Sequence, residues 1–165
     1  MTPIFSALLL AAAAFAFPTV TGKNLNGTVF HLPSDFAAPV NLVFVPFVRN
    51  QQSDVDSWKP FVSDLKSRHP RLGVYEVPTL SSGYSLFRGF IDGGMRSGIP
   101  DPAVRATTIT LYIDKHAFDS ALGIESESAI TVLLVRPNGE ILWRAMGRYD
   151  AANPPKLDEF LRETT

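Results

Sequence analysis

The sequence predicts an α/β fold with a central mixed sheet of about five strands, an N-terminal hairpin, flanking helices and a glycine-rich helical insertion. Three observations carry this prediction. Residues 40–48 form a nearly continuous apolar run, which is typical of a strand buried on both faces. A helical pattern follows, and residues 72–77 then indicate a second strand, which completes a βαβ unit. Two further runs, 130–136 and 140–146, flank a Pro-Asn-Gly turn and predict an antiparallel hairpin.

The first half of the chain follows from local signals taken in order. Residues 19–33 contain an Asn-Gly pair between short β-branched runs, the sequence signal of a hairpin. Ser53, with Asp56 three residues later, predicts a capping box that opens the helix after the buried strand. Pro60 lies inside that helix and is expected to kink it. The apolar positions at helical spacing, expected to face the core, are Val55, Trp58, Phe61, Val62 and Leu65.

The middle of the chain, about residues 81–106, is predicted to be an insertion. It carries five glycines around an expected helix from Tyr84 to Arg96, and a glycine inside a helix costs about 1 kcal/mol relative to alanine. Pro100 and Pro102 are expected to end this helix. The remaining predicted elements are a strand over 107–113, a helix over 115–122 capped by Asp114, and a last helix capped by Asn153.

Composition and charge exclude several classes of function. The 165 residues contain 15 Lys and Arg against 16 Asp and Glu, a net charge of −1, so bulk electrostatics cannot hold nucleic acid or an acidic membrane. There is no cysteine, which excludes disulfide exchange, thiol nucleophiles, iron–sulfur clusters and cysteine-ligated zinc. The three histidines are far apart, and no nucleotide-binding or serine-hydrolase motif is present. We therefore predict no catalytic residue, no cofactor and no bound metal.

Residues 1–16 resemble a secretory signal peptide. They carry no charged side chain, and residues 4–15 form an apolar run too short to cross a bilayer comfortably. Ala14 and Ala16 stand at the −3 and −1 positions of a signal-peptidase site. We therefore predict cleavage after Ala16 and a periplasmic or secreted domain over residues 17–165. An uncleaved anchor and an apolar helix of the domain are the alternatives.

Two spacings resemble the thioredoxin-like superfamily. A buried strand ends in Phe47, and a helix-kinking proline, Pro60, follows at the family's separation. Counting between them places Gln52 and Val55 where the redox cysteines stand. The turn of the last hairpin also resembles the family's, and counting back from it places Thr131 at the family's cis-proline. The resemblance implies a thioredoxin-like fold that has lost its redox centre, so thiol–disulfide oxidoreductase and peroxidase activities are excluded.

The C-terminal half resembles the mitochondrial ATP-synthase assembly-factor family and its bacterial relatives. The similarity lies in strands at 110–114 and 132–135, followed by a glycine-containing turn, Trp143 beside Arg144, and Gly147. That family is thioredoxin-like and is implicated in the maturation of a membrane-embedded ATP-synthase subunit. The resemblance therefore implies a protein client in a membrane complex such as ATP synthase, and an assembly role without redox chemistry.

Two stretches are candidate binding sites. The loop at the former redox position offers amide and hydroxyl groups beside a helix N-terminus, which suits an anion or a peptide backbone, with helix capping as the alternative. In the insertion, Arg88, Asp92 and Arg96 form a stripe that either clamps a carboxylate or phosphate or remains a solvated ion-pair stripe. The candidate binding residues are Arg49, Asn50, Gln51, Gln52, Ser53, Arg88, Asp92, Arg96, Thr131 and Trp143.

Together these observations predict a non-catalytic, exported thioredoxin-like protein that binds a protein client, with assembly of a membrane complex as its role. An alternative is an enzyme or binding protein that acts on an anionic small molecule through Arg88, Asp92 and Arg96. A third reading is a structural or peptide-binding module of the cell envelope.

Overall fold

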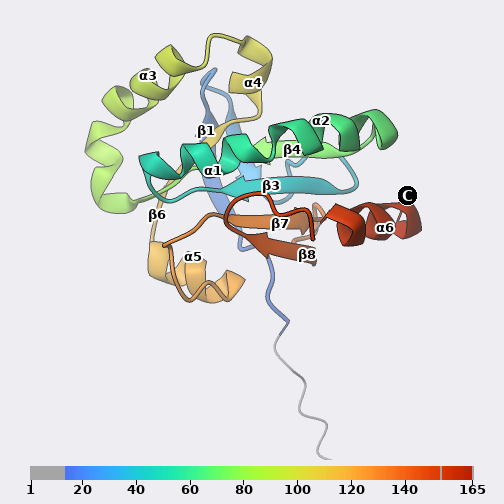
Figure 1. The fold of residues 1–165 in the computed structure, drawn as a ribbon. Coiled ribbons are helices and arrows are strands. Elements are labelled where there is room, and N and C mark those ends of the chain that lie inside the picture. The colour runs from blue at the N-terminus through green and yellow to red at the C-terminus, as the bar shows by residue number, and fades with distance from the viewer. Residues whose placement is uncertain (1–13, 153, 165) are drawn as a thin grey trace, which may run out of the picture.

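A computed structural model describes residues 14–152 and 154–164 (Figure 1). The strands are β1 Val20–Asn24, β2 Val29–Leu32, β3 Asn41–Val45, β4 Gly73–Glu76, β5 Thr79–Ser81, β6 Ile109–Ile113, β7 Thr131–Val135 and β8 Ile141–Met146. The helices are the 3₁₀ helices η1 Arg49–Gln51 and η2 Ser82–Phe87, and the α-helices α1 Gln52–Ser57, α2 Lys59–Arg68, α3 Arg88–Gly98, α4 Pro102–Ala106, α5 Lys115–Leu122 and α6 Pro154–Thr164. No described helix is both long and apolar enough to cross a membrane. Most of the predicted leader, residues 1–13, and the predicted cap Asn153 lie outside the described residues.

The strands form two four-stranded sheets, with the orders β2-β1-β6-β5 and β4-β3-β7-β8. The pairs β3–β4 and β5–β6 are parallel, and the other pairs are antiparallel. The two sheets are joined, because β4 leads directly into β5 and because Glu76 forms an isolated bridge with Thr108. These mixed sheets, the N-terminal hairpin and the flanking helices confirm the predicted fold class.

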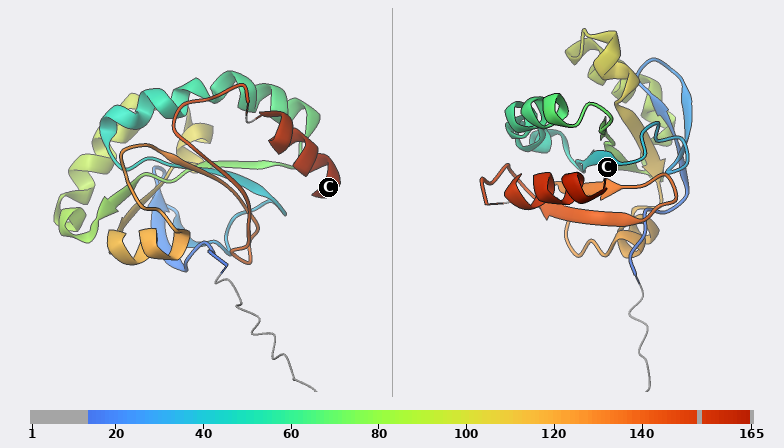
Figure 2. Two further views of the ribbon diagram at one scale, coloured as in Figure 1. Left: turned by 60° about the horizontal axis from the view of Figure 1, so that its bottom comes forward. Right: turned by 90° about the vertical axis from the view of Figure 1, so that its right-hand side faces the viewer.

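The predicted strand after residue 40 is buried on both faces, as expected. In β3, Val43 and Val45 point into one core cluster, while Leu42 and Phe44 point into the other. Residues of α5 and of the N-terminal segment complete the first cluster, and residues of α1, α2 and α6 complete the second. Figure 2 shows the helices placed on both sides of the strands accordingly.

The helical segment after β3 is interrupted two residues before the predicted proline. α1 ends at Ser57 and α2 begins at Lys59, with Trp58 between them. Pro60 stands in the first turn of α2, where its missing N–H leaves no helical hydrogen bond unmade. Trp58 is fully buried, as expected, and its Nε1–H donates to the Gly147 carbonyl at 3.0 Å. The break between the two helices thus falls at a residue that is anchored in the core.

The predicted capping box at Ser53 is wrong. The 3₁₀ turn η1 leads directly into α1, which begins at Gln52, so Ser53 lies inside the first turn. Its hydroxyl donates to the Asn50 carbonyl at 3.4 Å instead of capping the helix. The cap predicted for α5 is confirmed, since the Asp114 carboxylate accepts the N–H of Ala117 at 3.2 Å.

The insertion differs from the single helix expected from Tyr84. It begins as the 3₁₀ helix η2, and α3 follows from Arg88. Pro102 does not end this helix but opens the next one, α4, because a proline at the first helical position needs no N–H partner. The Asp101 carboxylate caps α4 by accepting the N–H of Ala103 at 2.8 Å. The three-residue strand β5 before η2 is absent from the sequence prediction.

Asp158 on α6 is buried, whereas the sequence predicts that it lies on a solvated helix face. Its carboxylate accepts hydrogen bonds from Arg68 and Arg162, and His69 Nε2 lies 2.8 Å from its Oδ1. The His69 hydrogen bond is the main cause that holds the pKa of Asp158 below its ordinary value. These contacts fasten α6 to the end of α2.

Candidate functional site

The dithiol edge, as we call residues 47–56, joins β3 to α1 where the thioredoxin-like resemblance places two cysteines. Gln51 holds this loop in place. Its Oε1 accepts the N–H groups of Phe47 at 2.8 Å and Val48 at 3.4 Å, and its Nε2 donates to the Glu127 carbonyl at 2.7 Å. Gln51 is buried, so this predicted binding residue is a structural lock and is not open to a ligand.

The two positions that match the missing cysteines have opposite environments. Gln52 is exposed, and its Nε2 donates to Asp56 at 3.3 Å and to Glu76 at 3.5 Å. Val55 is buried in the core cluster that contains Trp58. An amide and an alkyl group cannot perform thiol–disulfide exchange, which needs one attacking and one resolving thiol. The edge keeps its shape without its redox chemistry.

Glu76 is a site residue that the sequence analysis missed. It ends β4, and its side chain approaches Gln52. Burial raises the pKa of its carboxyl, the Gln52 hydrogen bond opposes this shift, and the charge of Asp56 adds to it. Glu76 therefore holds a proton more readily than a surface glutamate does. The available signal was a charged residue between Tyr75 and Val77 in an otherwise apolar strand.

The other predicted residues of the dithiol edge face solvent. Arg49, Asn50 and Ser53 are exposed, as is Gln52. Behind them the Asp54 carboxylate pairs with Arg148 at 3.0 Å, which ties the start of α1 to the loop after β8. The open part of the edge is therefore a short polar strip, and whether it binds a ligand stays a prediction.

Thr131 is less accessible than a binding role requires, whereas Trp143 is partly open. Thr131 pairs with Val45 across β3 and β7 and is buried, and its Oγ1 has no hydrogen-bond partner among the described residues. Because it is covered, Thr131 shares no open groove with Gln52. Trp143 is half-buried, and its ring packs edge-on against Trp58 with the centroids 6.4 Å apart.

The stripe of Arg88, Asp92 and Arg96 faces the body of the protein. Arg96 Nε donates to the Leu25 carbonyl at 2.7 Å, Asp92 accepts the Tyr112 hydroxyl at 2.8 Å, and the Arg88 guanidinium lies 4.7 Å from the Tyr112 ring centroid. Within the described part of the chain these three residues form no ion pair with one another. The expected solvated ion-pair stripe is therefore wrong, because the stripe holds α3 against β6. The anionic-ligand alternative stays a prediction, and none of these contacts favours it.

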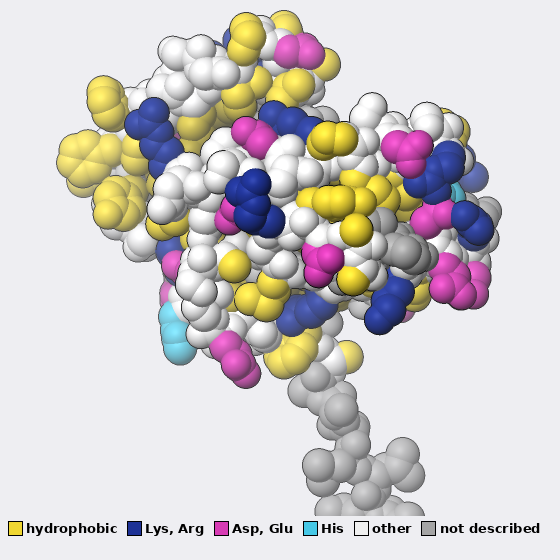
Figure 3. Space-filling model, viewed as in Figure 1, with side chains coloured by type: hydrophobic (Ala, Val, Ile, Leu, Met, Phe, Trp, Pro, Cys, Tyr) yellow, Lys and Arg dark blue, Asp and Glu magenta, His cyan; other side chains and the backbone are white. Residues whose placement is uncertain are grey.

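The outward side of the insertion is apolar. Leu86 is 91% exposed and Phe90 is 86% exposed, and Tyr84 and Phe87 are each more than half exposed. We call these four residues the apolar surface. Figure 3 shows hydrophobic side chains gathered at the left-hand edge of the molecule, over α3. The sequence analysis missed this surface, because helical spacing alone does not show which side of the helix packs on the sheet.

Four glycines leave the backbone of α3 open beside the apolar surface. A Cβ at Gly89, Gly93, Gly94 or Gly98 would meet no atom of the rest of the chain within 4 Å. Packing within the described chain therefore does not require glycine there, although a glycine inside a helix costs about 1 kcal/mol relative to alanine. The result is a helix whose outer backbone another molecule could approach closely.

Known structures match this architecture, although no family model and no curated protein matches the sequence. The thioredoxin domain of a thiol-disulfide oxidoreductase from Bacteroides vulgatus is similar with a TM-score of 0.57 and 18% identity, over 91% of this chain and 99% of that chain. ScoI of Arabidopsis thaliana, with copper bound, gives 0.62 and 10%, over 91% and 99%. BsSco, a member of the Sco family of cytochrome c oxidase assembly proteins, gives 0.59 and 12%, over 92% and 94%. The fold is thioredoxin-like.

Within this thioredoxin-like fold the chain lacks the thiols of a redox centre. It contains no cysteine. Among the residues described, no group of three His, Asp or Glu side chains could hold a metal ion. The comparisons give no support to the second resemblance, to the ATP-synthase assembly factors. The comparisons therefore show a shared fold at low sequence identity.

Proposed function

We propose that this chain is an exported, redox-inactive thioredoxin-like protein that binds a protein client through the apolar surface. The observation that carries the proposal is the nearly complete exposure of Leu86, at the end of η2, and of Phe90, in the first turn of α3. Large apolar side chains that gather on the surface of a domain mark an interaction site, because their exposure to water is unfavourable until a partner covers them. Export rests on the resemblance of residues 1–16 to a signal peptide.

The chemistry of the surface specifies the client further. The only carboxylate of α3, Asp92, is turned inward to the Tyr112 hydroxyl, so it does not face the client. Beside Phe90, Gly93 and Gly94 expose helix backbone with no side chain above it. An apolar segment with bulky side chains, such as one face of a helix, fits this combination. We propose a client segment of that kind.

An assembly role for a membrane complex is part of the proposal. BsSco, which shares this fold, belongs to a family of cytochrome c oxidase assembly proteins, so the fold is used in assembly elsewhere. In this chain the absence of cysteine limits that role to holding the client rather than oxidising or reducing it.

Photo-crosslinking from position 90 tests the proposal. A photoreactive phenylalanine analogue at Phe90, introduced into the full chain in its own cells, should crosslink one discrete membrane-complex component. Leu86→Asp should abolish that crosslink, because a carboxylate at the centre of the surface must be desolvated on binding. Val29→Asp is the matched control, since Val29 is a partly exposed apolar residue on β2, outside the surface. It should leave the crosslink unchanged.

Two results would contradict the proposal. One is a crosslink that Leu86→Asp and Val29→Asp leave equally strong. The other is binding of the pure protein to phospholipid vesicles that Leu86→Asp abolishes, with no protein crosslinked, which would make the apolar surface a membrane contact.

A further inference from the structure

Residues 14–16 of the chain lie in a groove between α5 and β8, away from the sites described above. The N–H of Ala16 donates to the Ala121 carbonyl at 3.3 Å. Ala16 also forms an isolated antiparallel bridge with Glu140, at the turn between β7 and β8. The segment is therefore held in the way that an added strand or an extended peptide is held at a sheet edge.

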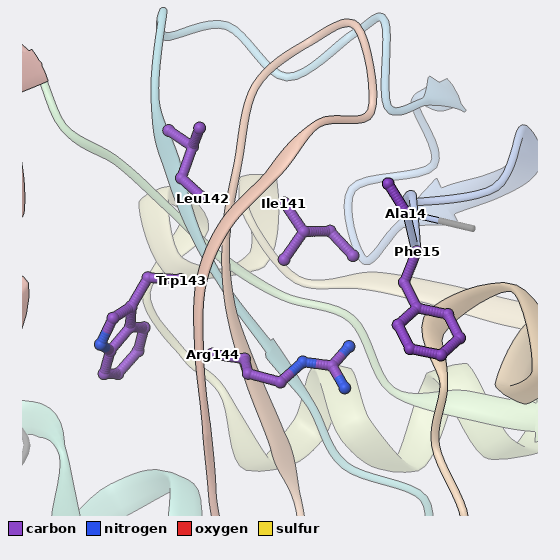
Figure 4. A pocket seen from close by; sticks show the side chains of 6 residues that line it. All are labelled: Ala14, Phe15, Ile141, Leu142, Trp143 and Arg144. Carbon is purple, nitrogen blue, oxygen red and sulfur yellow. The ribbon is translucent and has the colours of Figure 1, made fainter. Parts of the chain in front are cut away.

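The Phe15 ring packs over Gly123 at the end of α5. A Cβ built on Gly123 would lie 2.6 Å from the nearest ring atom, so a side chain at this position would displace the ring. The Arg144 guanidinium lies 5.7 Å from the ring centroid, within cation–π range, and it also donates to the Leu122 carbonyl, which fixes its position. Figure 4 shows Arg144 pointing toward Phe15 across the pocket.

An open pocket lies beside this segment. It has a volume of about 470 Å³ and is lined by Ala14 and Phe15 on one side and by Ile141, Leu142, Trp143 and Arg144 of β8 on the other. Phe15 itself is half exposed. Phe17 is buried, and no residue of either described core cluster precedes it. Residues 14–16 are therefore an occupant of the groove rather than a part of the core.

We propose that this groove binds an extended peptide in which a phenylalanine is flanked by small residues, and that residues 14–16 fill it within the full-length chain. The predicted cleavage after Ala16 falls between the occupant and the core, so removal of the leader opens the groove to a client segment of the same chemistry. The client's phenylalanine ring lies between Gly123 and Arg144, and its backbone N–H donates to the Ala121 carbonyl. The groove shares no residue with the apolar surface, so the two proposals stand or fall separately.

Binding of a short peptide to two forms of the chain tests the proposal. The probe is acetyl-Ala-Ala-Ala-Phe-Ala-amide, which copies residues 12–16, titrated by calorimetry and by the indole N–H NMR signal of Trp143. The chain of residues 17–165, which keeps the whole described core, should bind the probe. The full-length chain should bind it at least about tenfold more weakly, because a tethered occupant competes at a high effective concentration. Circular dichroism checks that the shorter chain is folded.

Three comparisons decide the outcome. The peptide with alanine in place of phenylalanine should not bind. Arg144→Ala in the 17–165 chain should weaken binding several-fold, whereas Arg148→Ala, which removes another exposed arginine outside the pocket, should not. If residues 17–165 do not fold, the Phe15→Asp variant of the full-length chain replaces them in the titration. This variant should bind the probe more tightly than the unchanged full-length chain does. The proposal would be overturned if the full-length chain and the 17–165 chain bound the probe equally well. It would also be overturned if the peptide with alanine bound as well as the peptide with phenylalanine.

Discussion

The dithiol edge and the apolar surface use their side chains in opposite ways. At the edge, Gln51 and Val55 are buried, one by hydrogen bonds and the other by packing. At the apolar surface, Leu86 and Phe90 are almost entirely exposed to water. The comparison shows that the buried residues of the edge stabilise the fold, while the insertion presents side chains that do little for stability. Substitution of a buried edge residue should therefore change stability, and substitutions on the apolar surface should change binding.

Gln51→Ala should give the largest effect. The change removes the acceptor of the Phe47 N–H and the donor to Glu127, and it leaves the buried N–H without a partner. We expect a loss of about 2–3 kcal/mol in the free energy of unfolding, measured by urea denaturation. Gln52→Ala is the matched control, because the same side chain one residue later is exposed, and it should change the value by less than about 0.5 kcal/mol. Equal losses from the two variants would break the contrast.

Tyr112→Phe should loosen the insertion from the body of the protein. The change removes the hydroxyl that donates to Asp92, the contact that turns the polar stripe of α3 inward. We expect a loss of about 1 kcal/mol in the free energy of unfolding, and faster hydrogen exchange at the α3 amides. Tyr84→Phe removes the same hydroxyl from the apolar surface and should leave both measurements unchanged. A similar effect from both would show that α3 is not held through Tyr112.

Gly93→Ala should stabilise the protein while it weakens client binding. A Cβ at position 93 meets no neighbour, so the change adds helix propensity, worth about 0.5–1 kcal/mol in thermal unfolding. The added methyl group keeps a client away from the helix backbone. Gly22→Ala is a control with the opposite expected effect on stability. Its Cβ would lie 2.8 Å from the Thr110 carbonyl oxygen, so the change should destabilise the sheet. A destabilising Gly93→Ala would mean that the helix face is already covered.

The smallest effect is expected in the pH dependence of stability. The group responsible is Asp119, which lies near Glu127, the residue whose carbonyl accepts a hydrogen bond from Gln51. Burial, and then the charge of Glu127, raise the pKa of Asp119 from 3.8 to about 6. The folded protein therefore binds this proton more tightly than the unfolded chain does, and stability should fall as the pH rises from about 4 to about 6. Asp119→Asn should flatten this part of the melting-temperature profile, whereas Glu125→Gln, at an exposed position in the following loop, should not. An unchanged profile in Asp119→Asn would contradict this account.

The fold could be predicted as far as it follows from local patterns. The continuous apolar run of β3 and the proline after it predict a buried strand followed by a bent helix, since burial and a missing N–H act on the residues that carry them. The exposure of Phe90 could not be predicted in this way. It depends on which side of α3 packs against the sheet. The hydroxyl of Tyr112, on the distant strand β6, fixes that side by donating a hydrogen bond to Asp92.

The candidate site shows the same division. Counting from Phe47 predicted which loop matches the redox edge of a thioredoxin-like fold, but it could not show that Gln51 points inward to a carbonyl 76 positions later in the chain. Asp158 was similarly misjudged, because Arg68 and His69 approach it from the end of another helix. Whether a polar side chain is available to a ligand depends on its long-range partners. The residues next to it in the sequence do not identify those partners.

Pro78 divides one extended stretch of chain between the two sheets, with β4 paired to β3 on one side and β5 paired to β6 on the other. The backbone that ends at Glu76 thus continues, through a single short strand, into η2 and the apolar surface. A pull on the insertion by a bound client would be shared at once by both halves of the molecule. The short strand β5 would thus act as a mechanical support for a load applied at the periphery of the domain.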